Sequence, residues 1–217
     1  MKSKVPSYLA ICDQERGDSQ AVRASLSRFV AHFKGKKRVV DLGCGRGEFL
    51  ECLKAAGVGA LGVEQDAHLV KYCRTRGLKV ESGNVLGFLK NSRPKSADGF
   101  FLSHVIEHFT PAQASEIFGN MGRILPSSGI AVLVTPNPLS LGVVTHSFWR
   151  DPTHVRPYPA DLLARLGGDH GFEVVEKGET SLMGSGGVVR ALARRLRKLL
   201  VGDYFHDPDA FIVLRKK

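Results

Sequence analysis

The sequence lacks both a long apolar run and a recognisable secretion signal. No uninterrupted apolar stretch approaches the roughly 18 residues that a membrane-spanning helix needs, so we expect a protein that is soluble or touches a membrane only at its surface. Residues 6–16 contain Cys12, Asp13 and Glu15 where a secretory sequence has its apolar core. We therefore expect a cytoplasmic protein.

Cysteines are also few, and their spacing is uninformative. Cys12, Cys44, Cys52 and Cys73 form no Cys-x-x-Cys pair and have no histidine at zinc-finger spacing. The pattern favours neither a disulfide framework nor a structural metal, and we expect no metal site. Cys44 lies within a glycine-rich loop, where a small side chain suits a tight turn better than nucleophilic chemistry.

The 217 residues do contain a regular alternation of short apolar runs with longer amphipathic ones. This alternation is typical of βαβ units and predicts an α/β fold with a mostly parallel sheet. We expect a Rossmann-like, seven-stranded sheet with helices on both faces and an antiparallel last strand. The length suits a single domain, 1–217. Strands are expected at 38–42, 60–64, 79–82, 99–103, 130–135, 172–177 and 210–214. Helices are expected at 48–56, 67–76, 86–90, 111–125, 159–166 and 188–200.

An additional helix is expected before the first strand. Apolar residues recur at helical spacing over 19–33, which predicts an amphipathic helix. Segment 1–36 is therefore interpreted as a helical lid or brace. The longest region without clear periodicity is 137–158, and long irregular segments of this kind are often functional.

A glycine-rich loop follows the first strand and opens a helix. Without Cβ atoms, Gly43 and Gly45 let backbone N–H groups approach a ligand closely at the carboxyl edge of the sheet. A dinucleotide site would have a third glycine where Glu48 stands, and a carboxylate there repels a pyrophosphate. Asp41 and Glu48 suit instead the ammonium group of S-adenosylmethionine, which carries no phosphate. Cys44 lies within the same cofactor loop.

Polar residues at the ends of the next two strands suit the nucleoside. Glu64 ends the second strand, where a carboxylate accepts hydrogen bonds from ribose hydroxyls, and Gln65 follows it. Asn84 and Val85 follow the third strand, where an amide side chain and a backbone N–H suit the adenine edge. The combination of loop, acid and amide in sheet order is much harder to obtain by chance than any one of them.

These residues carry a family resemblance. Segments 39–50 and 62–66 resemble the class I S-adenosylmethionine-dependent methyltransferases, and the resemblance extends over most of the chain, 15–175. Segment 103–109 is similar to the segment after their fourth strand, which lines the methyl-transfer cavity. The resemblance implies that Ser103 and His104 lie beside the cofactor.

A narrower resemblance concerns the acceptor. Segments 135–138 and 148–158 resemble methyltransferases of bacterial polysaccharide and O-antigen biosynthesis, including domains that cap glycan chains. This implies a glycan or lipid-linked saccharide, methylated on a sugar hydroxyl or a terminal phosphate. Residues 15–17 resemble an Arg-Gly element of that group, which implies that Arg16 lies near the cofactor carboxylate. The chain departs from the family at Asn84, commonly Asp, and at 127–129, where Ser-Ser-Gly replaces Pro-Gly-Gly.

Methyl transfer is an in-line displacement at an activated carbon, so the protein mainly positions the two partners. A sugar hydroxyl is a weak nucleophile that profits from a general base, whereas a phosphate oxygen needs none. The candidate bases are His104, His108, Asp151 and His154. We favour His154 with Asp151, because both lie in the irregular segment expected over the carboxyl edge of the sheet.

Positive charge is concentrated near the C-terminus. The net charge is +10, and 188–200 contains five basic residues and no acid, with its valines and leucines on another helical face. Two interpretations are open: the apolar face packs on the last strands, or the helix lies on an anionic membrane.

Other functions also remain open. The acceptor is alternatively a small molecule such as a quinone precursor, or the chain is a non-catalytic subunit that keeps the cofactor fold. Nucleic acid has no support beyond charge, since no Asn-Pro-Pro-Tyr or Asp-Pro-Pro-Tyr signature is present. Trp149 and Tyr158 either stack on a sugar ring or close a core. The oligomeric state is not indicated.

Overall fold

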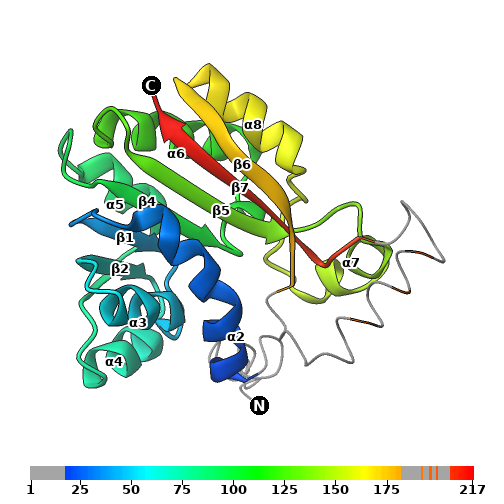
Figure 1. Cartoon of the computed structure of the whole chain (residues 1–217), viewed down its shortest axis with the longest axis horizontal. Helices are drawn as coiled ribbons and strands as arrows, with labels where there is room; N and C mark the ends of the chain where they lie inside the picture. Colours follow the sequence, from blue (N-terminus) through cyan, green and yellow to red (C-terminus); the bar gives the residue numbers. More distant parts are fainter. Residues whose placement is uncertain (1–17, 182–191, 193–195, 197–198, 200–205) are drawn as a thin grey trace, which may run out of the picture.

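The computed structural model describes residues 18–181, 192, 196, 199 and 206–217, which form a seven-stranded sheet of order β3-β2-β1-β4-β5-β7-β6 (Figure 1). The strands are β1 (Val39–Leu42), β2 (Ala60–Glu64), β3 (Val80–Ser82), β4 (Gly99–Ser103), β5 (Ile130–Pro136), β6 (Phe172–Thr180) and β7 (Asp209–Lys216). All seven expected strands are confirmed, with β6 three residues longer than expected.

The direction of the strands is also confirmed. Strand pairs β1–β2, β1–β4, β2–β3 and β4–β5 are parallel, whereas β7 runs antiparallel to both β5 and β6, between which it lies. The chain leaves β1 toward β2 and β3 and then returns to the other side of β1 with β4. This reversal is a topological switch point, and sheets of this kind bind ligands in the crevice outside the carboxyl ends of the strands at that point, here β1 and β4.

Five expected helices between the strands are confirmed. They are α3 (Glu48–Ala55), α4 (Ala67–Thr75), α5 (Val85–Asn91), α6 (Pro111–Ile124) and α8 (Ala160–Asp169). The region that showed no periodicity contains a short helix, α7 (Leu141–Thr145), and a 3-10 turn, η3 (Ser147–Arg150), while η2 (Ile106–His108) follows β4. These elements are one turn long, too short to leave a hydrophobic period in the sequence.

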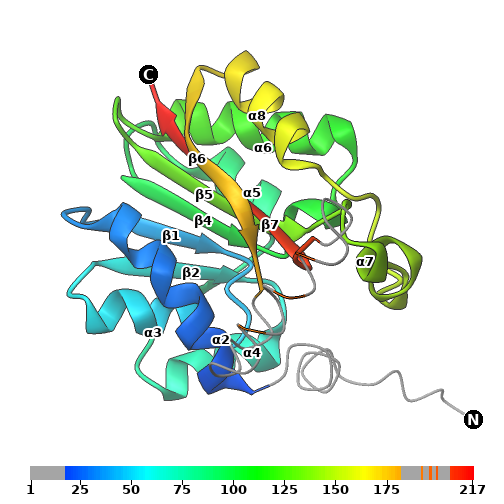
Figure 2. The same ribbon diagram turned by 45° about the vertical axis from the view of Figure 1, so that its right-hand side comes forward.

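Two apolar layers cover the sheet, because neighbouring residues on a strand face opposite sides. On β4, Phe100 and Leu102 pack with α5, α6 and α8, whereas Phe101 packs with α2, α3 and the segment between α2 and β1. Strands β5 and β7 alternate in the same way. Figures 1 and 2 show α2 and α3 on one face and α5, α6 and α8 on the other.

The N-terminal helix packs against the sheet. It comprises α2 (Ser19–Leu26) and a 3-10 helix, η1 (Ser27–Phe33), and the Asp18 carboxylate caps it by accepting a hydrogen bond from the Ala21 N–H. Phe29 and Phe33 are fully buried against the sheet. Arg16 lies outside the described residues, and so does most of the helix expected at 188–200. Among the described residues, no helix is long and apolar enough to cross a membrane.

Candidate active site

The glycine loop lies at the carboxyl end of β1, in the crevice. Gly43, Gly45 and Gly47 have φ angles of 71°, 54° and 81°, a region that favours glycine. A Cβ on Gly43 would lie 2.6 Å from Cγ2 of Val105, which follows β4. The loop therefore needs glycine both for its backbone path and for its close approach to the neighbouring strand.

The buried carboxylate of Glu64 holds this loop. Its Oε2 accepts a hydrogen bond from the Gly45 N–H at 2.9 Å, and its Oε1 accepts one from the Asp66 N–H at 2.9 Å. A carboxylate has about four acceptor positions, so each oxygen keeps capacity for a further donor. The two ribose hydroxyls of S-adenosylmethionine are such donors, so the Glu64 carboxylate fits this cofactor.

Glu48 has a partner that the sequence did not suggest. Its Oε1 lies 2.6 Å from Nε of Arg46, and both side chains are buried. The same carboxylate oxygen accepts a hydrogen bond from the Ser19 hydroxyl at 3.1 Å, which ties α2 to the loop. Glu48 thus organises the loop, and its contact with a cofactor ammonium group stays a prediction. Asp41 is buried within β1, directly before the loop.

The residues expected to hold adenine lie at the start of α5. The Asn84 side chain is exposed, and its Oδ1 caps α5 by accepting a hydrogen bond from the Gly87 N–H at 2.7 Å. Asp is also a good helix cap, so the departure from the family preserves this local function. Val85 is buried and Gln65 is exposed. Their contacts with adenine stay predictions.

His104 follows Ser103 at the end of β4 and has a positive φ of 54°. Its Nε2 lies 3.0 Å from Oδ1 of Asp209, and its Nδ1 lies 3.4 Å from Oε1 of Glu107. Burial lowers the pKa of His104, but Asp209 and Glu107 outweigh it and raise the pKa to about 10. With this pKa His104 keeps its proton at neutral pH, which argues against a role as general base; the sequence showed neither carboxylate partner.

His108 and His154 come together although they are far apart in the sequence. Their ring centroids are 4.8 Å apart. Nδ1 of His154 lies 2.6 Å from the Phe148 carbonyl oxygen. The rings of His154 and Phe148 also pack together, with their centroids 4.5 Å apart. Burial lowers the pKa of His108, even though the charge of Glu107 opposes the shift. His108 is therefore neutral near pH 7.

Asp151 approaches His154 but does not hydrogen-bond to it. Its Oδ2 lies 3.9 Å from Nε2 of His154, which is an ion-pair distance only. The Asp151 carboxylate instead accepts hydrogen bonds from the N–H and the hydroxyl of Thr153, at 2.8 and 2.6 Å. The structure therefore brings Asp151 and His154 close together, but the hydrogen-bond partner of Asp151 is Thr153.

Burial and hydrogen bonding indicate the roles of Trp149, Tyr158 and Cys44. Trp149 is 64% exposed, and its Nε1 donates a hydrogen bond to the Val144 carbonyl at 2.7 Å. Tyr158 is fully buried, and its hydroxyl donates to the Phe109 carbonyl, so it closes the core. A hydrogen bond with Cys73 and burial raise the pKa of the Cys44 thiol, which is consistent with a structural role.

Comparisons with known proteins identify the family. A model described as a methyltransferase domain matches residues 14–177. The structure of a SAM-dependent methyltransferase from Archaeoglobus fulgidus is 30% identical, the match covers 97% of this chain and 100% of that one, and the TM-score is 0.82. A search of curated proteins found no match.

Two more distant structures show the same fold. One, from Thermotoga maritima, is described as a SAM-dependent methyltransferase and possible histamine N-methyltransferase; it is 18% identical, with 97% and 95% of the two chains covered and a TM-score of 0.68. The other, a putative S-adenosylmethionine-dependent methyltransferase from Listeria monocytogenes, is 15% identical, with 92% and 98% covered and a TM-score of 0.66. This chain belongs to the methyltransferase-domain family and is an S-adenosylmethionine-dependent methyltransferase with a Rossmann-like fold.

Proposed function

We propose that this enzyme methylates a hydroxyl of a cell-surface glycan or a lipid-linked saccharide. The observation that carries the proposal is the pairing of His108 with His154 in the segments that follow β4 and β5. Both segments lie at the edge of the sheet that carries the cofactor loop. A hydroxyl acceptor needs activation and a phosphate does not, so the pair of histidines favours the hydroxyl.

The residues divide the work between two sides of the crevice. Bound S-adenosylmethionine supplies a methyl group on a positively charged sulfur, which makes its carbon open to attack. Glu64 binds the ribose hydroxyls of the nucleoside end, and Asp41 and the glycine loop lie where the amino-acid end is expected. On the acceptor side, Nε2 of His154 accepts the proton that the hydroxyl loses, and Trp149 offers an exposed ring on which a sugar packs.

The location of the acceptor suggests contact with a membrane surface. Leu192, Leu196 and Leu199 are helical and 66%, 54% and 81% exposed, which favours the membrane interpretation over packing of these leucines on the last strands. The surrounding sequence, 188–200, supplies five basic residues. Exposed leucines next to basic residues favour an anionic membrane surface, where a lipid-linked saccharide is found.

Transfer of a labelled methyl group from S-adenosylmethionine tests the acceptor class. The purified protein is incubated separately with cell-envelope glycan, total RNA and a small-molecule fraction. We expect label in the glycan fraction, lost on treatment that cleaves sugars. Label confined to the small-molecule fraction would favour a quinone-type acceptor, and cofactor binding without label in any fraction would favour a non-catalytic subunit.

A further inference from the structure

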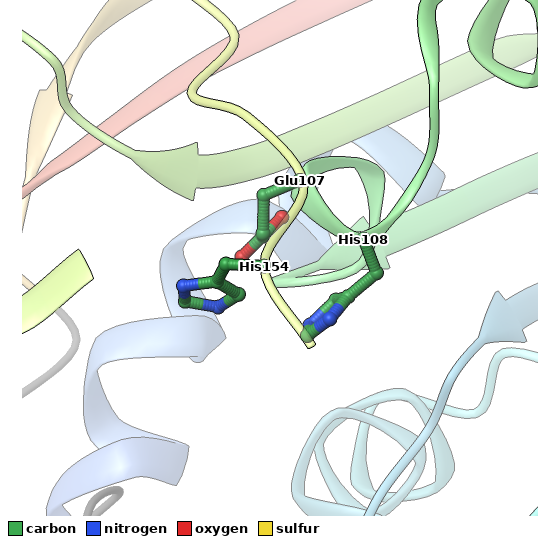
Figure 3. A group of neighbouring side chains, drawn as sticks. All are labelled: Glu107, His108 and His154. Atoms are coloured by element: carbon green, nitrogen blue, oxygen red, sulfur yellow. The ribbon is translucent and has the colours of Figure 1, made fainter. Parts of the chain in front are cut away.

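The crevice also contains a cluster of metal-ligand groups. Glu107, His108 and His154 each offer one ligand atom, and these atoms lie within 4.8 Å of one another (Figure 3). Ligands around one transition-metal ion lie about 3 to 4 Å apart, because each bond is about 2.1 Å long. Small side-chain rotations are therefore enough to close the group around an ion.

Hydrogen bonds fix the tautomer of each histidine. Nδ1 of His154 faces the Phe148 carbonyl at 2.6 Å, and a carbonyl only accepts, so this nitrogen carries the proton. Nδ1 of His108 faces the Thr153 carbonyl at 3.3 Å and the Thr153 hydroxyl at 2.9 Å. That hydroxyl gives its own hydrogen to Asp151 and accepts from His108. In the neutral form both rings therefore present the lone pair of Nε2.

This arrangement is typical of metal-ligating histidines. Such a histidine donates its other N–H to a carbonyl or to a carboxylate, directly or through a further group, and this orients the ring. His154 bonds directly to a carbonyl, and His108 bonds to Asp151 through Thr153. The sequence suggested no metal site because its cysteines are the wrong ligands, whereas these partners meet only in the folded chain.

The third ligand is a buried carboxylate with unused capacity. Glu107 is fully buried, and its Oε1 has no hydrogen-bond partner within the described part of the chain. Oε2 accepts a long hydrogen bond, 3.4 Å, from the Thr135 hydroxyl. Nδ1 of His104 lies 3.4 Å from Oε1, which is an ion-pair distance. Such an underused carboxylate beside two imidazoles is a further indication of a bound cation.

The backbone and the local charge both support this site. The N–H groups of Val155 and Arg156 donate to the Glu107 carbonyl at 2.9 and 3.3 Å, which joins the His154 segment to η2. The carboxylates of Glu107, Asp151 and Asp209 lie around this group, and negative charge attracts a cation.

We propose that Glu107, His108 and His154 bind a first-row divalent transition-metal ion, which in turn binds the acceptor hydroxyl. Two imidazoles and one carboxylate favour such an ion over magnesium, which prefers oxygen ligands. The inference rests on the function proposed above and changes one step of it. The coordinated hydroxyl gives its proton to solvent, the oxygen forms its bond to the methyl carbon, and the carbon–sulfur bond breaks with its electrons passing to sulfur.

Cobalt binding tests this site without any acceptor. The full chain is stripped of metal with a chelator and titrated with Co²⁺, whose visible absorption reports its ligands. We expect one Co²⁺ per chain, bound at least about tenfold more weakly by His108→Ala and by His154→Ala. His68→Ala removes an exposed histidine on α4 and is expected to bind like the wild type. Equal Co²⁺ affinity in wild type and both variants, or no binding, would overturn the proposal.

Two further measurements separate metal loss from misfolding. S-adenosylmethionine binding by both histidine variants is expected to stay within about twofold of wild type, which shows that the crevice is intact. Thr153→Val removes the hydroxyl that orients His108 and is expected to weaken Co²⁺ by about tenfold. A cobalt site in a protein that methylates no glycan contradicts the proposed function alone. Glycan methylation by a protein without a cobalt site contradicts this inference alone.

Discussion

Ser128 occupies a backbone conformation that costs energy for any residue with a Cβ. It has a φ of 67° in the turn between α6 and β5, and its side chain is exposed. The left-handed region costs a non-glycine residue roughly 1 kcal/mol or more. We expect Ser128→Gly to stabilise the protein by about 0.5–1 kcal/mol. The gain is measured from the urea midpoint at constant slope.

Ser127 provides the matched control for this substitution. It is also exposed but is not among the described residues with positive φ. Glycine there only increases the freedom of the unfolded chain, so Ser127→Gly is expected to lower stability by a few tenths of a kcal/mol to about 1 kcal/mol. Equal effects at both positions would show that φ does not determine the outcome.

At this scale the sequence predicts residues that end strands better than residues that meet across the fold. Glu64 could be placed at the carboxyl edge because β2 ends on it. The contacts of His104 could not be predicted, because Asp209 is near it only as a result of the position of β7 between β5 and β6.

Glu51 joins three helices on one face of the sheet. Its carboxylate on α3 pairs with Arg23 on α2, at 2.5 Å, and with Arg76 at the end of α4. Burial opposes ionisation of Glu51, but the two arginines outweigh it and lower the pKa. The stabilisation is therefore present above the pKa of the unfolded chain, about 4.3, and is lost as pH falls through the lower pKa of the folded state.

We expect Glu51→Gln to destabilise the protein by about 1 kcal/mol at pH 7. The difference from wild type should shrink as the pH falls below about 4, where the wild-type carboxylate becomes protonated. Urea unfolding at several pH values measures this. Glu116→Gln removes an exposed pair with Lys90 and should cost less, about 0.5 kcal/mol or below. A difference that does not change with pH would exclude the charge of Glu51 as the cause.

Helices long enough to show several repeats of the apolar pattern were predictable, and one-turn helices were not. Helix α6 has a proline in its first turn and a capping box formed by Thr110 and Gln113, so its start is encoded locally. Helix α7 is only five residues long, and the adjoining η3 only four. Their positions depend on packing against the rest of the chain, and this is the region that places His154.

At the scale of the whole molecule, charge and exposed leucines predict where the enzyme acts. We expect the full chain to co-sediment with phosphatidylglycerol vesicles more strongly than with phosphatidylcholine vesicles. Replacing Leu192, Leu196 and Leu199 with serine should abolish most of this difference. Equal weak binding to both vesicle types would end the membrane interpretation.

The alternation of strands and helices and the glycine loop are both visible in the sequence, which is why the fold class and the cofactor loop were predictable, whereas the order of the strands was not. The acceptor side was not, because it is built from two irregular segments that become neighbours only through the pairing of β4 with β5. The cofactor side binds and orients S-adenosylmethionine, and the acceptor side activates the hydroxyl.

The most direct test measures cofactor binding and turnover in parallel for Glu64→Gln and His154→Ala. Glu64→Gln is expected to weaken S-adenosylmethionine binding by about tenfold or more, because it removes a charged acceptor. His154→Ala should bind the cofactor within about twofold of wild type while turnover on the glycan falls by about 100-fold or more. Unchanged turnover in His154→Ala, or an equal loss of cofactor binding in both variants, would contradict the account.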